Sequence, residues 1–233
     1  MASAPARLLP RRDGDARTAL AEVARRHRPV SAAHERVIPV PGPLGELLPN
    51  AALARGAVVG VEGIPGAGAS SVALTLAAAV TAVGEWAAAV DLDGSLGGRA
   101  AAEAGVALDC FAVVRPPPGR HKVSGFPPDR WAAVVATLLD GMSLVIAELP
   151  RSVRAADARR LVARAREREV ILVPFGPARS WAADTTLRVH AVGGDWPGLD
   201  EGSGLLGERT IRVQVEGRGA AARPRTGALV LAS

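Results

Sequence analysis

Apolar residues along this chain gather into short runs that are separated by longer amphipathic stretches. Short apolar runs predict buried strands, and apolar residues at helical spacing predict helices. The predicted strands cover residues 57–62, 86–92, 111–115, 144–149 and 170–173, and the predicted helices cover residues 70–83, 96–104, 131–140 and 155–168. Because strands and helices alternate, we expect a mostly parallel sheet with helices packed on it.

The pattern changes in the last part of the chain. Apolar runs at residues 187–192, 211–216 and 228–231 are joined by Gly-rich turns, which predicts a β-meander of antiparallel edge strands. Residues 37–49 contain four prolines and two glycines and are expected to form an extended or turning link. The sequence thus predicts an α/β core domain over residues 37–233, preceded by an arm over residues 1–36.

The arm is the most basic part of the chain. Residues 1–36 contain eight arginines and four acidic residues, whereas the rest of the chain has 20 basic and 19 acidic side chains. Asp15 could cap a short amphipathic helix that runs to about His27. Such an arm can contact nucleic acid, dock in a groove of a protein partner, or simply be solvated. The residues selected for the partner-binding face are Leu20, Val23 and Ala24.

Composition narrows the class of protein. The single cysteine, Cys110, excludes an internal disulfide bond and suits a reducing cytoplasm. The chain has no run of about 18 apolar residues, so no membrane span is expected. Lys122 is the only lysine, which leaves arginine as the main source of positive charge.

A Gly-rich loop after the first core strand carries the strongest chemical signal. Gly63, Gly68 and Ser70 match the phosphate-binding pattern G-x-x-x-x-G-K-[ST], and Ala69 occupies the position of its lysine. Backbone N–H groups of such a loop can surround a phosphate at a helix N-terminus. The lysine steadies the phosphates during transfer, so we expect its loss to impair hydrolysis more than binding.

No ligand of this loop is therefore assigned, and ATP and Mg²⁺ are the candidates. The alternative is a tight strand-to-helix turn that binds nothing. The candidate nucleotide-binding residues are Gly63, Gly66, Gly68, Ala69, Ser70 and Ser71.

Acidic residues stand at the ends of two predicted strands, where ligand sites of α/β proteins gather. Asp91 and Asp93 stand at the end of the strand at residues 86–92, and Glu148 stands at the end of the strand at residues 144–149. Asp93 and Glu148 are the catalytic candidates, and Ser70 and Glu148 are the candidate Mg²⁺ ligands. Each could instead cap a helix or form an ion pair. No nucleophile–base pair is found, so no enzyme activity is assigned.

Arginines and tryptophans give further candidate contact surfaces. Six arginines on or next to the predicted helix at residues 155–168 could meet DNA phosphates or acidic partner groups, or face solvent. Trp86 and Trp131 are expected to pack in or near the core. Trp181 and Trp196 lie in polar or Gly-rich surroundings, and exposed tryptophans mark interfaces. Of these, Trp196 is selected as a partner-binding residue.

Three segments together resemble the RecA recombinase family. They are Leu53–Gly56 before the loop strand, Ala89–Asp93 with the following Ala104–Asp109, and Ser143–Glu148. The resemblance implies a RecA-like P-loop core, in which Asp93 matches the water-activating glutamate and Glu148 matches the Walker B aspartate. The missing lysine and the short segment after Val173 depart from the family, and they argue against recombinase activity.

Among RecA-like proteins with such losses, the chain resembles the ImuA family, in its actinobacterial ImuA-prime type. This resemblance implies a cytoplasmic accessory protein of SOS mutagenesis, associated with the nucleoid after DNA damage. The implied partner is an ImuB-type protein, an inactive relative of Y-family polymerases, and through it an error-prone C-family DNA polymerase. RecA, and DNA through arginine-rich surfaces, are further candidate contacts. Two alternatives stay open: a DNA-stimulated ATPase that mediates recombination, and a RecA-like inhibitor of cell division.

Overall fold

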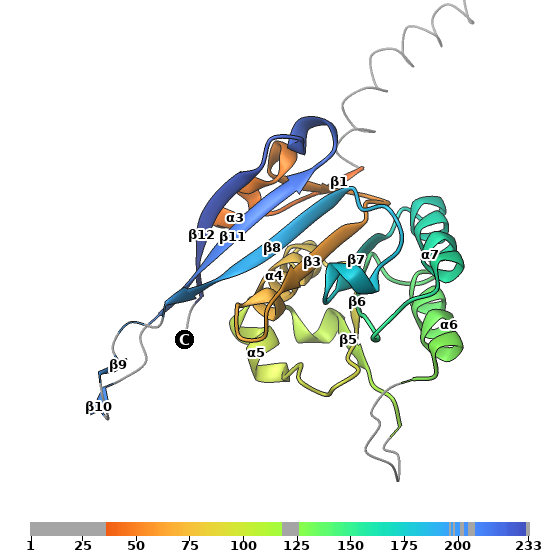
Figure 1. Ribbon diagram of the computed structural model, residues 1–233, viewed down its shortest axis with the longest axis horizontal. Helices are drawn as coiled ribbons and strands as arrows, with labels where there is room; N and C mark the ends of the chain where they lie inside the picture. Colours follow the sequence, from red (N-terminus) through yellow and green to blue (C-terminus); the bar gives the residue numbers. More distant parts are fainter. Residues whose placement is uncertain are drawn as a thin grey trace, which may run out of the picture. The chain divides into compact units, whose positions relative to one another are not determined.

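The computed structural model describes residues 36–117, 126–195, 197, 199–200, 203–204 and 208–231. Its main feature is an eight-stranded sheet with the strand order β12-β11-β8-β3-β7-β6-β4-β5 (Figure 1). Most neighbouring strands are parallel, and the strands at the C-terminal end of the chain are antiparallel. The predicted mixed α/β class is therefore confirmed. Among the described residues, no helix is long and apolar enough to cross a membrane.

The parallel part of the sheet alternates with helices along the chain. Strands β4, β6 and β7 are buried over nearly their whole length, which explains why the sequence shows them as continuous apolar runs. The strands are β3 (Val59–Gly63), β4 (Ala87–Val90), β5 (Phe111–Val114), β6 (Leu144–Glu148) and β7 (Ile171–Phe175). The connecting helices are α4 (Ala69–Thr81), α5 (Gly98–Glu103), α6 (Pro128–Leu138) and α7 (Ala155–Glu167). The predicted alternation of strands and helices is confirmed.

The antiparallel part adds three long strands on the other side of β3. β8 (Leu187–Asp195) runs parallel to β3, β11 (Arg209–Gly217) runs antiparallel to β8, and β12 (Arg225–Leu231) forms the edge. Between β8 and β11, β9 (Leu199–Asp200) and β10 (Ser203–Gly204) pair with each other. The predicted closing β-meander is confirmed, and its strands are longer than the apolar runs indicated.

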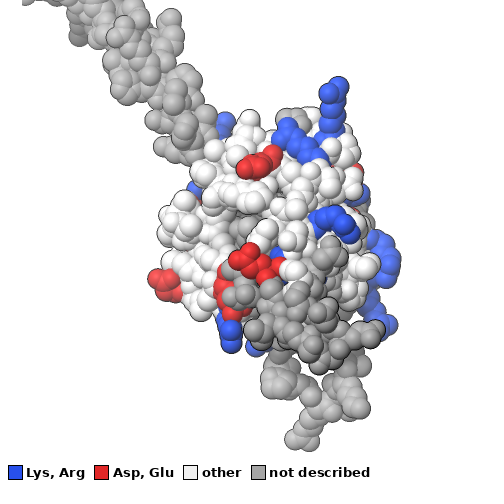
Figure 2. Space-filling model, turned by 90° about the vertical axis from the view of Figure 1, so that its left-hand side faces the viewer, with Lys and Arg blue, Asp and Glu red and all other residues white. Residues whose placement is uncertain are grey.

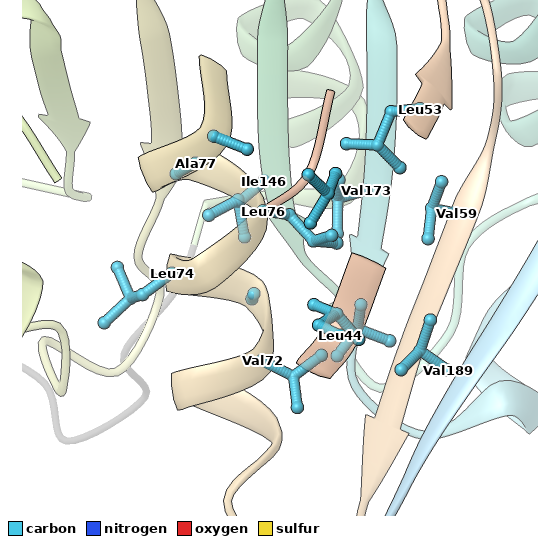
Figure 3. Close-up of a cluster of buried hydrophobic side chains, with 14 of the residues drawn as sticks. Leu44, Leu53, Val59, Val72, Leu74, Leu76, Ala77, Ile146, Val173 and Val189 are labelled. Carbon is cyan, nitrogen blue, oxygen red and sulfur yellow. The ribbon is translucent and has the colours of Figure 1, made fainter. Parts of the chain in front are cut away.

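Two hydrophobic clusters lie on opposite faces of the sheet. Helix α4 packs on one face, and helices α6 and α7 pack on the other. In Figure 3, Leu76 of α4 lies beside Val173 of β7. The helices change face between α5 and α6, because Ala101 of α5 belongs to the cluster of α4 and Trp131 of α6 belongs to the cluster on the opposite face.

The segment at residues 37–49 is more regular than the extended or turning link that was predicted. It begins with β1 (Val37–Pro39), which pairs with β2 (Ala52–Ala54), and continues with the helix α3 (Gly42–Leu47) and the 3-10 turn η1 (Pro49–Ala51). Prolines are tolerated in the first turn of a helix, so the proline content did not exclude one. Leu44 and Leu48 are fully buried against the α4 face, and this burial stabilises the segment.

Candidate functional site

The carboxyl edge of the parallel strands brings together the loop and the acidic residues that the sequence singled out. Val61 of β3 is in register with Phe175 of β7, which is in register with Glu148 of β6, and β4 follows beside β6. Strands lie about 4.8 Å apart, so β3 and β6 are separated by roughly 10 Å. The carboxyl edge of the parallel strands is where ligands of open α/β sheets bind.

The Gly-rich loop joins the end of β3 to the start of α4, as predicted. Its tip is a tight turn in which the N–H of Ala67 donates to the carbonyl oxygen of Ile64 at 2.9 Å. Pro65 and Gly66 occupy the middle of the turn, and the φ of +82° at Gly66 is the value that a type II turn requires. The amide of Ala67 is thus used inside the loop and does not face a ligand.

Two of the loop glycines are required by packing. Gly68 has a φ of +97°, and a Cβ added to it would lie 2.8 Å from Cγ2 of Ile211 in β11. A Cβ on Gly63 would lie 2.9 Å from the carbonyl oxygen of Ala191 in β8. Both positions exclude side chains whether or not a phosphate binds.

The start of helix α4 offers little charge of its own. Ala69 is partly buried and packs against the core, at the position where the pattern has lysine. Ser70 is exposed, Ser71 is partly exposed, and no side chain caps the helix, so the structure shows no capping role for Ser70. Arg209, at the start of β11, instead donates from Nη2 to the carbonyl oxygen of Gly66. The sequence reasoning missed Arg209, because nothing in the sequence links it to a loop more than 140 residues earlier.

Asp91 holds the segment after β4 together. Its side chain is fully buried and accepts from the N–H of Ser95 at 3.0 Å and from that of Leu96 at 3.3 Å. The Nε of Arg115 donates to the same carboxylate at 2.7 Å, and Nη2 of Arg115 donates to the carbonyl oxygen of Leu96 at 2.6 Å. Arg115 therefore ties β5 to the Asp91 segment.

Glu148, at the end of β6, also holds the segment after β4 in place. Its Oε2 accepts from the N–H of Leu92 and, at 3.4 Å, from that of Asp93. Burial raises the pKa of Glu148 above its ordinary value of 4.5, and the neighbouring Asp93 carboxylate raises it further. Hydrogen bonds from Ser95 lower the pKa of Asp93.

The structure brings three predicted carboxylates together as a cluster, in which one oxygen from each lies within 4.8 Å of the others. They are Asp91, Asp93 and Glu148. Carboxylate oxygens are ligands that Mg²⁺ favours. In this chain, however, each of the three carboxylates accepts backbone N–H groups, so their position has a structural cause that needs no ion.

The arginine-rich helix α7 is partly neutralised. Asp140, at the end of α6, pairs with Arg164 at 2.5 Å and with Arg168 at 3.3 Å, and Asp157 pairs with Arg160 at 3.7 Å. The space-filling view of the side where β12 and α3 lie shows charged side chains spread among uncharged ones, without a continuous basic track (Figure 2). The contact of the α7 arginines with DNA stays a prediction.

The burial of two of the tryptophans differs from the prediction. Trp131 is buried, as expected, and its Nε1 donates to the carbonyl oxygen of Glu148 at 2.9 Å. Trp86, which was expected in or near the core, is 49% exposed at the start of β4. Trp181, which was expected at the surface, is only 9% exposed because it packs in the α6–α7 cluster. The candidates Leu20, Val23, Ala24 and Trp196 lie outside the described residues, and so does Lys122.

Comparison with known families gives one match. Residues 46–183 match the model of the MT3502 N-terminal domain. The matched region contains the Gly-rich loop, the three carboxylates and all helices from α4 to α7. The chain therefore belongs to the MT3502 N-terminal domain family, a domain of unclear function. None of the curated proteins matches the chain.

Proposed function

We propose that this member of the MT3502 N-terminal domain family is a RecA-like accessory protein of an SOS-induced translesion-synthesis complex. In this role it binds an ImuB-type protein and performs little or no ATP hydrolysis. We infer the RecA-like core from the order of the structural elements along the chain. A strand, a Gly-rich loop and a helix are followed by two carboxylate-ended strands at the same sheet edge.

The proposal rests on one observation: the Gly-rich loop lacks a charged side chain at Ala69, and the carboxylates support the neighbouring backbone. Ala69 supplies no charge to the loop, and the amide of Ala67 is used in the turn of the loop itself. Asp93 and Glu148, the candidates for water activation and metal binding, support the backbone of residues 92–95. Catalysis of phosphoryl transfer depends on positioned charge, so this arrangement favours a binding role over a catalytic one.

The proposed partners follow from the ImuA resemblance. The ImuB-type protein would contact the arm at residues 1–36 or the C-terminal strands, and would connect the chain to a C-family polymerase. RecA, and DNA in a weak contact, are further proposed partners in the cytoplasm and at the damaged nucleoid. Stable co-purification with an ImuB-type protein after co-expression tests this directly. Failure of the two chains to associate at micromolar concentration would contradict the adaptor function.

Nucleotide binding is tested by isothermal titration with ATP and Mg²⁺, on the wild type and on Ala69→Lys. We expect no measurable heat from the wild type at about millimolar ATP, which corresponds to binding weaker than about −4 kcal/mol. The variant restores the lysine position of the pattern and is expected to bind more tightly. Micromolar binding by the wild type would show that nucleotide is part of the mechanism.

One observation favours the second candidate, a DNA-stimulated ATPase that mediates recombination. The guanidinium of Arg209 contacts the loop at Gly66 and provides positive charge close to where a phosphate would sit. DNA-dependent phosphate release by the wild type, abolished in Arg209→Ala, would favour this candidate. Absence of phosphate release with and without DNA would leave the adaptor function.

A further inference from the structure

Strand β12 forms one edge of the eight-stranded sheet, and β5 forms the other (Figure 1). β12 pairs with β11 over all seven of its residues, from Arg225 to Leu231. Every second residue of a paired strand directs its N–H and C=O groups away from its neighbour. Within the described residues, no other strand or loop forms backbone hydrogen bonds with β12. β12 therefore presents a row of unpaired donors and acceptors along about 23 Å.

This edge lacks the features by which proteins prevent two sheet edges from pairing. Those features are charged side chains, prolines and bulges. Residues 226–231 contain no charged residue and no proline, and their pairing with β11 has no irregularity. On the side of the molecule where β12 lies, charged side chains are scattered among uncharged ones (Figure 2). A second strand can therefore approach β12 without meeting a protecting charge on the strand itself.

The other edge of the sheet is protected. β5 has only four residues, Phe111–Val114, and short edge strands offer few groups for pairing. It is followed by Arg115, whose side chain binds Asp91, and by Pro116 and Pro117, which have no backbone N–H. The contrast identifies β12 as the edge that is open to another strand.

The two faces of β12 differ in their cover. Leu229 is buried in the hydrophobic cluster of α4, and Gly227 lies against Leu47 of α3. The alternate residues Ala228 and Val230 are exposed, and the exposed fraction of the Val230 side chain is 57%. The strand is thus fixed to its own core on one face, and on the other it offers small and apolar side chains that a neighbouring strand could cover.

We propose that β12 pairs antiparallel with β12 of a second copy of this chain, so that one sheet runs through both copies. Full overlap of the two strands places Ala228 opposite the partner's Ala228, and Thr226 opposite the partner's Val230. Arg225 then lies opposite the partner's Leu231, so no charge of the strand meets a like charge. Exposed apolar and β-branched side chains become cross-strand pairs, which stabilise sheets.

Symmetry limits this association to two copies. A contact between identical strands is the same on both sides, so it uses the open edge of each copy and closes. Pairing of β12 with β5 of another copy would repeat without closing, and the short, proline-flanked β5 opposes it. The inference does not rest on the proposed adaptor function. It assigns the β12 edge to self-association, which leaves the arm at residues 1–36 as the candidate contact for an ImuB-type protein.

Sedimentation velocity of the full chain tests the association. The range of about 5–500 µM is needed, because a contact made by one pair of strands is small and depends on concentration. We expect the mass to rise from that of one chain to that of two chains, and no further. Ala228→Lys places two like charges opposite each other and is expected to raise the concentration needed for dimers about tenfold or more. Val113→Lys, at an exposed position of β5, is the matched control, with unchanged association expected.

Amide hydrogen exchange locates the contact in the wild type without any substitution. We expect the amides of residues 225–231 to exchange about fivefold more slowly at the highest concentration than at the lowest, because half of them gain acceptors. The amides of β5 are the internal control, and their exchange rates are expected to be independent of concentration.

A wild type that remains monomeric over this range, or a dimer that persists unchanged in Ala228→Lys, would overturn the inference. Loss of the dimer in Val113→Lys would also overturn it, because the contact would then involve β5. Protection of β12 only when an ImuB-type protein is added would show that another protein occupies this edge. If Ala228→Lys does not fold, hydrogen exchange in the wild type still decides. Co-purification with an ImuB-type protein is measured separately, so that dimers without co-purification would contradict only the adaptor function.

Discussion

The two segments that follow β3 and β4 lie at the same sheet edge, and each maintains its shape by a different means. The Gly-rich loop relies on glycine conformation and on the close approach of Ile211 and Ala191. Its tip, from Ile64 to Gly66, is exposed. The segment after β4 relies on two carboxylates, a fully buried Asp91 and the partly buried Glu148, which accept its backbone N–H groups.

The difference separates two causes for residues that look like parts of an active site. Glycines of a phosphate-binding pattern can be required by neighbouring strands, and carboxylates at strand ends can be required by the backbone beside them. In both segments a structural requirement accounts for the residue type without a ligand. Substitutions can therefore measure how much of each segment is structural.

The largest effect is expected from Asp91→Ala. The substitution leaves the N–H groups of Ser95 and Leu96 and the guanidinium of Arg115 without their acceptor. We expect a loss of about 3 kcal/mol in the free energy of unfolding, measured by urea denaturation. Asp91→Asn keeps one acceptor oxygen and is the control, for which a clearly smaller loss is expected. Equal losses in the two variants would show that the backbone bonds contribute little.

Gly68→Ala should have the next largest effect, because it places a Cβ at positive φ and 2.8 Å from Ile211. We expect a loss of about 2 kcal/mol in the same measurement. Gly66→Ala is the matched control: its φ is also positive, but a Cβ there meets nothing within 4 Å. A loss of about 1 kcal/mol is expected for Gly66→Ala. If the two variants lose the same stability, the contact with Ile211 is not a constraint on the loop.

A smaller effect concerns pH. Because the pKa of Glu148 is raised on folding, its contribution to stability is present below the ordinary value of 4.5 and is lost as pH rises through the raised value. In Glu148→Gln, the decrease in the free energy of unfolding as pH rises above 4.5 is expected to be absent. The lowered pKa of Asp93 has the opposite sign, and its contribution is present above 3.8 and lost as pH falls through the lowered value. Urea denaturation at a series of pH values distinguishes the two, and an unchanged pH profile in Glu148→Gln would contradict the burial argument.

The smallest effect is expected from Ser70→Ala. The hydroxyl is exposed and caps nothing, so the free energy of unfolding should change by less than about 0.5 kcal/mol. A loss near 1 kcal/mol in thermal or urea denaturation would instead indicate a cap. If stability is unchanged while ATP binding with Mg²⁺ is weakened, Ser70 would retain the metal role of the phosphate-binding pattern.

The sequence predicted the parallel core well, because β4, β6 and β7 are buried on both faces and helices with amphipathic periodicity separate them. It also placed the loop and the carboxylates at strand ends that meet at one edge. It failed for α3, because the four prolines of residues 37–49 outweighed the apolar residues in the prediction. Leu44 and Leu48 are buried against side chains that are distant in the sequence, which the local pattern does not show. The contacts of Arg209 and Trp181 could not be predicted, since both depend on strands that are far apart in the sequence.

The pairing of α3 with β12 has a consequence for the order in which the fold can be completed. The Cδ2 of Leu47 lies 3.0 Å from the position of a Cβ on Gly227, and Arg225 contacts the carbonyl oxygen of Leu48 at 3.5 Å. During synthesis on the ribosome, α3 is made long before residues 225–231. Until those residues emerge, β11 is an open edge and Leu47 of α3 lacks its contact with Gly227. Release from the ribosome shortly before that point would leave a chain prone to aggregation, although its parallel core would already be present.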